Sequence, residues 1–234
     1  ESADGGGGGH HRPADRCKGI AIMPMRKMSE FTSLAAPLPE NNIDTDVIFP
    51  ARFLLILAKE GVGQYAFHER RKGAGSDFVL DRPPYDKAEI LVTGSNFGTG
   101  SSREQAVWTL ADLGIRCVIA RSFGEIFFSN CYKNGVLPIV LGEDAMLAVE
   151  AAANAAEQIT VDLPNECLRL ANGTQIAFTI EPYRKQALMA GLDEVGMILT
   201  QDLAAIEAYE SRRKLNTPWV TAGSEQLELH SGND

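Results

Sequence analysis

Three short apolar runs, separated by segments with helical spacing, constrain the fold of this chain more than any other feature. The runs and the segments between them alternate at residues 87–93, 102–114, 116–121, 124–133 and 135–141. The first intervening segment places Ala106, Leu110 and Leu113 on one face of a helix. A strand–helix–strand–helix–strand order predicts a parallel sheet with right-handed crossovers. The expected fold class is therefore α/β.

After the third apolar run the pattern changes. One alanine-rich helix and three short strands are expected, at residues 143–158, 159–163, 167–170 and 175–180. Asn172 and Gly173 join the last two strands, and Asn-Gly between β runs is typical of a type I′ hairpin turn. Residues 182–213 predict helices that break at Gly191 and Gly196.

The two ends of the chain look less structured than its middle. Residues 1–24 include five consecutive glycines and few side chains that could be buried, so we interpret them as a disordered leader or an artefact. The polar residues 216–234 are expected to form a flexible tail. A single domain is therefore expected over residues 25–215.

Composition and charge exclude several classes of function. Lys and Arg number 22 against 31 Asp and Glu, a net charge of −9, and this argues against non-specific nucleic-acid binding. No run approaches the roughly 18 apolar residues of a membrane span. The spacing of the cysteines favours reduced thiols in a cytoplasmic protein and predicts no metal bound by this chain. The cysteines, none of them in a C-x-x-C pair, are Cys17, Cys117, Cys131 and Cys167.

The most informative segment for function, residues 94–106, joins the first apolar run to the first predicted helix. Its glycines allow the backbone to turn sharply and to approach a ligand closely. Residues 101–104, Ser-Ser-Arg-Glu, match a capping box, so a helix is expected to begin there and its N–H groups to attract an anion. Arg103 adds a planar fork suited to a carboxylate. Since neither the dinucleotide nor the P-loop pattern fits, a small carboxylate site and a plain capped turn both remain open.

Two further segments carry candidate residues. In residues 42–50, Asp44 and Asp46 are spaced for metal binding or acid–base work, and also for simple loop capping, which we favour. In residues 120–134 the aromatic side chains are expected to be core, whereas Asn130 and Asn134 are expected to cap or to hydrogen-bond across a cleft.

Taken in order, these segments resemble the small subunits of 3-isopropylmalate dehydratase, a detached version of the mobile C-terminal domain of aconitase. The resemblance runs from about Met25 to Val220. It implies a swivelling β/β/α domain in a hydro-lyase with a separate large subunit, as a heterodimer or heterotetramer, whose large subunit holds a [4Fe–4S] cluster. The implied reaction converts 2-isopropylmalate into 3-isopropylmalate through isopropylmaleate, in leucine biosynthesis.

The resemblance also implies roles for individual residues. Ser101 matches the catalytic base, whose alkoxide needs nearby positive charge, and Arg103 acts beside it. Ser102 and Arg103 match ligands of the substrate carboxylate. The substrate-binding residues are completed by Gly98, Gly100 and the substrate-selecting loop of Arg52, Phe53, Leu54 and Leu55. Supporting roles fall to Asp44, Asp46, Asn96, Thr99, Gln105, Asn130 and Asn134.

Three departures from the family pattern bear on the substrate. Thr99 replaces a common cysteine, Gln105 a usual histidine, and Leu55 an often polar residue. Because Ser101 and Arg103 are retained, the departures affect the substrate more than the reaction type. One alternative is therefore a related hydro-lyase subunit acting on citraconate, maleate or dimethylmaleate. A second is a non-catalytic anion-binding or assembly domain.

Overall fold

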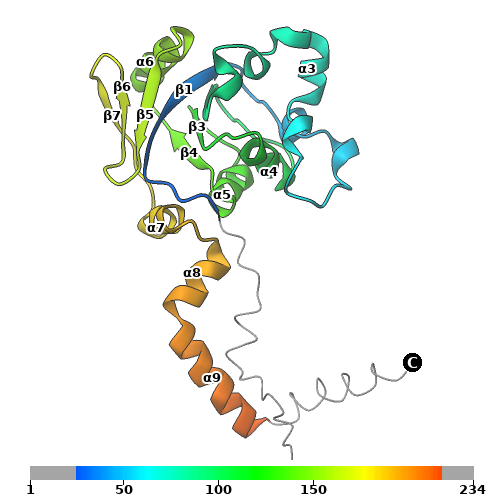
Figure 1. The fold of residues 1–234 in the computed structure, drawn as a ribbon, viewed down its shortest axis with the longest axis vertical. Helices are drawn as coiled ribbons and strands as arrows, with labels where there is room; N and C mark the ends of the chain where they lie inside the picture. The colour runs from blue at the N-terminus through cyan, green and yellow to red at the C-terminus, as the bar shows by residue number, and fades with distance from the viewer. Residues whose placement is uncertain (1–24, 218–234) are drawn as a thin grey trace, which may run out of the picture. The chain divides into compact units, whose positions relative to one another are not determined.

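The structure is a computed structural model that describes residues 25–217. These residues fall into two compact units, one that ends at Asp193 and one that contains the helices α8 (Glu194–Gln201) and α9 (Leu203–Asn216) (Figure 1). The predicted leader lies outside the described residues, as does the predicted tail except for its first two residues. The candidate site belongs to the first unit.

A seven-stranded sheet, in the order β4-β3-β2-β1-β5-β6-β7, forms the frame of the first unit. Its strands are β1 (Glu30–Leu38), β2 (Ile90–Thr93), β3 (Cys117–Ala120), β4 (Leu137–Val140), β5 (Gln158–Asp162), β6 (Cys167–Leu170) and β7 (Gln175–Ala177). Strands β1 to β4 are parallel, and β5 to β7 continue the sheet in antiparallel pairing. Strand β1 joins the two halves, because residues 30–34 pair with β5 and residues 35–38 pair with β2.

The helices of the first unit are α2 (Thr45–Ile48), α3 (His68–Ala74), α4 (Gln105–Asp112), α5 (Glu125–Lys133), α6 (Glu143–Asn154) and α7 (Pro182–Ala190). Of these, α4 and α6 contribute to the cores on opposite faces of the parallel half. Five short 3-10 helices lie at Ala51–Phe53, Gly63–Tyr65, Gly75–Asp77, Val79–Asp81 and Tyr85–Lys87. Helix α6 packs on β1, β2 and β5, whereas α4 packs against α2 and α5.

Alternating strand residues build two hydrophobic cores. Ile90 and Val92 of β2 join the core under α6, and Leu91 between them joins the core under α4. The first core also takes in side chains from β5 and β6, so the antiparallel strands complete it. This arrangement confirms the predicted α/β class and its β/β/α layering.

The strand–helix–strand–helix–strand order is confirmed, but three local predictions are wrong. Asn172 does not have the positive φ that a type I′ turn requires; only Gly173 does, and its N–H bonds to Leu170 O at 3.0 Å. Gly196 lies inside α8, so the break predicted there falls later in the chain. The predicted capping box is absent from the start of α4. Strand β1 was not predicted.

Candidate active site

The loops that follow β1, β2 and β3 meet at the carboxyl edge of the parallel half. Backbone N–H groups of the glycine loop, residues 94–104, donate to the loops on both sides. Gly98 N bonds to Ile43 O at 2.7 Å, and Phe97 N bonds to Ser122 O at 3.1 Å. The carboxyl edge of parallel strands is where open α/β sheets place ligands. The fold therefore positions the predicted serine–arginine segment at the expected edge.

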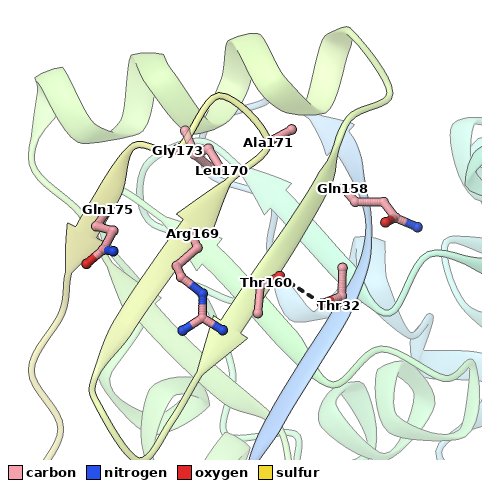
Figure 2. A pocket seen from close by; sticks show the side chains of 8 residues that line it. All are labelled: Thr32, Gln158, Thr160, Arg169, Leu170, Ala171, Gly173 and Gln175. Atoms are coloured by element: carbon pink, nitrogen blue, oxygen red, sulfur yellow. Dashed lines mark hydrogen bonds between the residues drawn. The ribbon is translucent and has the colours of Figure 1, made fainter.

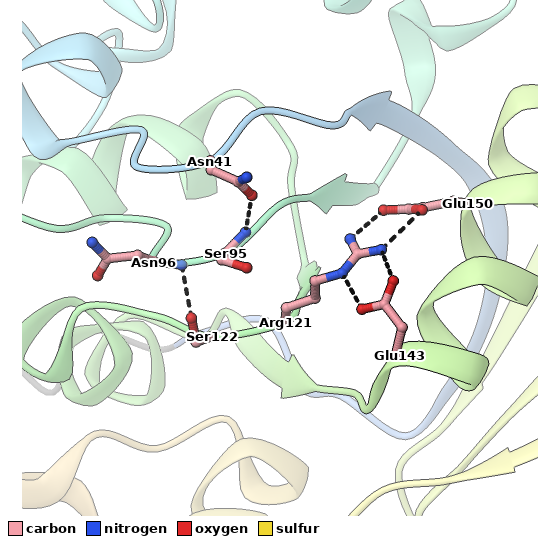
Figure 3. A network of polar contacts seen from close by, with 7 residues as sticks. All are labelled: Asn41, Ser95, Asn96, Arg121, Ser122, Glu143 and Glu150. Atoms are coloured by element: carbon pink, nitrogen blue, oxygen red, sulfur yellow. Dashed lines mark hydrogen bonds and ion pairs between the residues drawn. The ribbon is translucent and has the colours of Figure 1, made fainter.

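Polar side chains fix the start of the glycine loop (Figure 3). The amide oxygen of Asn41 accepts from Ser95 N at 2.7 Å, and Ser122 Oγ accepts from Asn96 N at 2.8 Å. Beside Ser122, the Arg121 guanidinium donates to both carboxylates of α6 that face it, Glu143 and Glu150. These contacts tie the end of β3 to α6 and give the glycine loop a fixed neighbour.

The loop backbone adopts conformations that most side chains avoid. Asn96 has φ 57° and Gly98 has φ 72°. A side chain at position 98 would overlap the buried ring of Phe127, so glycine is needed there for space as well as for conformation. Gly100 also has positive φ, 98°, and the nearest atom to a methyl group there would be Asp44 Cβ at 3.5 Å.

Ser101 is exposed, and its hydroxyl is held by a residue that sequence reasoning did not select. Thr45 Oγ1 lies 3.0 Å from Ser101 Oγ. Thr45 is 1% exposed and begins α2, where Asp44 accepts from Val47 N at 2.7 Å as the N-cap. The loop-capping interpretation of Asp44 is therefore confirmed. Thr45 lies between Asp44 and Asp46, in a segment that the sequence analysis selected. Its position there is the sequence signal that could have identified it.

Arg103 is largely buried and forms an ion pair with Asp46. The Arg103 guanidinium lowers the pKa of the Asp46 carboxyl, against a smaller opposing effect of burial. Asp46 Oδ1 also accepts from Ala51 N at 3.2 Å. A buried guanidinium paired with a half-exposed carboxylate is a site where a second carboxylate can enter. Ser102, beside Arg103, is exposed.

Helix α4 begins at Gln105, after the serines, and no side chain forms the predicted cap. The Glu104 carboxylate instead accepts from Asn134 Nδ2 at 2.9 Å and from Trp108 Nε1 at 3.1 Å. Burial acts to raise the pKa of Glu104, but these hydrogen bonds and nearby lysines lower it overall. The glutamate therefore links α4 to α5, which leaves Ser101 free to contact Thr45.

The predicted substrate-selecting loop follows α2 in the chain and lies at the surface. Phe53 stacks on Tyr65, with 4.3 Å between ring centroids, and Arg52 pairs with Glu69. Leu54 is half-buried, whereas Leu55 is 93% exposed and Leu57 is 80% exposed. The loop therefore presents an apolar tip.

The remaining predicted residues lie around this core of contacts. Thr99 O accepts from Thr45 N at 3.0 Å, so the main chain of Thr99 rather than its side chain holds α2. Asn134 caps the end of α5, as predicted, whereas Asn130 is buried within that helix and not at a cap position. The Asn96 amide donates to Asn42 Oδ1 at 2.9 Å.

Among residues 25–217, no group of three histidine, cysteine or acidic side chains is arranged to hold a metal ion. Cys117 and Cys131 lie in the two hydrophobic cores, and burial raises the pKa of both thiols. The helices in this range are too short or too polar to cross a membrane.

An open hollow lies on the antiparallel half of the sheet (Figure 2). Its lining comes from β1, β5, β6 and β7 and includes none of the predicted site residues. Arg169 within it is already paired with Glu30 and Asp162, each at 2.5 Å. We therefore assign no anion site to this hollow.

Comparison with known proteins shows the family of this chain. A model of the aconitase C-terminal domain matches residues 25–144, and a LeuD_N model matches residues 145–182. The 3-isopropylmalate dehydratase small subunit of Dinoroseobacter shibae is 45% identical over 202 residues, which cover 84% of this chain and 100% of that protein. The chain belongs to the family of 3-isopropylmalate dehydratase small subunits.

A second relative supports the same assignment, and a solved structure shares the fold. The 3-isopropylmalate dehydratase small subunit of Rhodospirillum rubrum is 47% identical, over 84% of this chain and 97% of its own length. The crystal structure of 3-isopropylmalate dehydratase (LeuD) from Methanocaldococcus jannaschii shares the fold, with a TM-score of 0.59 and 24% identity. It covers 76% of this chain and 99% of its own.

Proposed function

We propose that this chain is the small subunit of a 3-isopropylmalate dehydratase that acts in leucine biosynthesis. With its large subunit, it interconverts 2-isopropylmalate and 3-isopropylmalate through isopropylmaleate. The observation that carries the proposal is the position of Ser101 and Arg103 together at the carboxyl edge of a family-typical fold. The partner completes a heterodimer or heterotetramer.

Ser101 is proposed as the base that removes the proton α to a substrate carboxylate. A serine hydroxyl is a very weak acid, so its alkoxide needs donors and positive charge nearby. Thr45 supplies one donor when its hydroxyl points to Ser101 Oγ, which is 3.0 Å away. Arg103, in the same loop as Ser101, is proposed to supply the positive charge.

Ser102 and Arg103 are proposed to bind the carboxylate next to the reacting carbon. Asp46 occupies one side of the Arg103 guanidinium, so an incoming carboxylate must share the fork or displace Asp46. Asp46 is half-exposed and therefore has room to move. Gly98 and Gly100 keep the intervening backbone compact enough for the substrate to approach.

We assign the [4Fe–4S] cluster to the large subunit. Cys117 and Cys131 are core residues, and the half-buried Cys167 lies on β6 in the other half of the sheet. Free thiols at these three positions also support a reducing compartment, the cytoplasm.

The loop at Arg52 to Leu55 is proposed to select the group attached to the diacid. Its exposed apolar tip suits a substrate with an isopropyl group better than one with a bare diacid. Citraconate and dimethylmaleate, which lack that group, are therefore the discriminating competitors.

The test uses this chain assembled anaerobically with its large subunit and a rebuilt cluster. We expect kcat/KM for 3-isopropylmalate to exceed the values for hydration of citraconate and dimethylmaleate. A preference for the smaller diacids would replace the proposed substrate and keep the reaction type. Absence of turnover on all three would contradict the proposed function and favour an assembly role.

A further inference from the structure

The segment at residues 51–59, here called the tip loop, is fastened at its first residue to the carboxylate-binding arginine. Ala51 N donates to Asp46 Oδ1 at 3.2 Å, and the same carboxylate pairs with Arg103. The start of the tip loop and the Arg103 guanidinium therefore both contact the Asp46 carboxylate.

The last residue of the tip loop is fastened to the neighbour of that arginine. Lys59 Nζ donates to Asn134 Oδ1 at 3.0 Å, and Asn134 Nδ2 donates to Glu104 Oε1 at 2.9 Å. The Lys59 ammonium also lies 4.9 Å from the centroid of the Trp108 ring, and Trp108 donates to Glu104. Both ends of the loop therefore lead to the Arg103-Glu104 pair.

The exposure of side chains along the tip loop shows that the contacts of Lys59 are unusual for a lysine. Lys59 is half-buried although lysine is usually exposed, whereas Leu55 and Leu57 are 93% and 80% exposed. Removing an ammonium from water is costly unless partners compensate. Here the compensation comes from an amide, an indole face and a nearby carboxylate, all on α4 or α5 or at their ends.

We propose that Lys59 is a positioning residue that fixes the tip loop relative to Arg103, so that the apolar tip and the carboxylate-binding fork keep a set separation. The proposal rests on the proposed function for its kinetic consequence. The tether itself is a property of the free chain and does not depend on turnover.

The first experiment measures the tether without activity. Chymotrypsin is added to the full chain, and the initial rate of cleavage after Leu55 and Leu57 is followed by mass spectrometry. Lys59→Met keeps the aliphatic stem and removes the charge, so cleavage should become about tenfold faster. Lys59→Arg should stay close to the unaltered chain, and so should Lys87→Met, which alters an exposed lysine elsewhere.

The second experiment measures the consequence in the assembled enzyme. Lys59→Met should raise KM for 3-isopropylmalate about tenfold with a smaller change in kcat, and Lys59→Arg should restore it. Unchanged cleavage in Lys59→Met, or equal acceleration in Lys87→Met, would overturn the tether. Faster cleavage with an unchanged KM would overturn the positioning role. Failure of the proposed function would instead appear as absent turnover in the unaltered pair.

Discussion

The two halves of the sheet contain the same kinds of polar pairs and use them differently. On the antiparallel half, Thr32 Oγ1 lies 2.7 Å from Thr160 Oγ1, directly across adjacent strands. At the carboxyl edge of the parallel half, Thr45 Oγ1 lies 3.0 Å from Ser101 Oγ; Thr45 begins α2, whereas Ser101 lies in the glycine loop. Each half also has an arginine paired with an acidic side chain, Arg169 and Arg103.

The difference lies in the backbone that carries these pairs. The antiparallel pairs sit in regular register on adjacent strands, where they stabilise the sheet. At the carboxyl edge, each pair has one member in α2 and the other in the glycine loop, which has positive φ at Asn96, Gly98 and Gly100. Residue chemistry alone therefore does not define the site; irregular backbone at the edge of parallel strands does.

The largest difference between the halves is expected from their glycines. Gly98→Ala places a methyl group on the Phe127 ring at positive φ, and should reduce the free energy of unfolding by about 3–5 kcal/mol. Gly173→Ala also has positive φ but meets no atom within 4 Å, so a loss of about 1 kcal/mol is expected. Urea unfolding of both variants measures the contrast. Equal losses would show that the close packing of the glycine loop is unimportant.

The hydroxyl pairs should differ in catalysis. Thr45→Val keeps the buried shape and removes the donor to Ser101, so kcat should fall on the order of 100-fold with little change in KM. Thr160→Val removes the matching hydroxyl on the antiparallel half and should leave both constants unchanged. Steady-state kinetics of the assembled enzyme decides, and a normal kcat in Thr45→Val would remove Thr45 from the site.

The smallest effect is expected at acid pH on the antiparallel half. Hydrogen bonds from Asn165 and the nearby Arg169 lower the pKa of Asp162 to about 2, against the cost of its burial. Because the ordinary value is 3.8, ionised Asp162 stabilises the fold above pH 3.8. This stabilisation is lost as the pH falls toward 2. Asp162→Asn should therefore flatten the dependence of stability on pH between these values, measured by thermal unfolding. An unchanged acid limb would contradict the assignment.

Most of the fold could be predicted because local patterns agreed with the tertiary structure. The apolar runs that became β2 and β3 are buried on both faces, and such strands read as continuous apolar segments. Strand β1 escaped prediction because Ala35, Ala36 and Pro37 favour strands poorly. Pro37 is tolerated there because residues 35–38 pair with β2 and not with β5.

The site was predictable only where its residues are close in sequence. The glycine loop and its serine–arginine segment were found because their spacing carries the signal. Thr45 and Ser101 are 56 positions apart, and Lys59 and Asn134 are 75 apart, so their pairing depends on the tertiary fold. The prediction of a capping box was wrong for the same reason. The side chains of Ser101 and Glu104 contact Thr45 and Asn134, which are distant in sequence, and so do not form the predicted cap.

The most direct test of this account is the turnover of Ser101→Ala in the assembled enzyme. The substitution removes the hydroxyl from an exposed loop position, so the subunits should still assemble, as checked by size-exclusion chromatography with a rebuilt cluster. The expected result is loss of 3-isopropylmalate turnover with assembly intact. Normal turnover in the assembled variant would contradict the claim that the carboxyl edge of the parallel half provides the base.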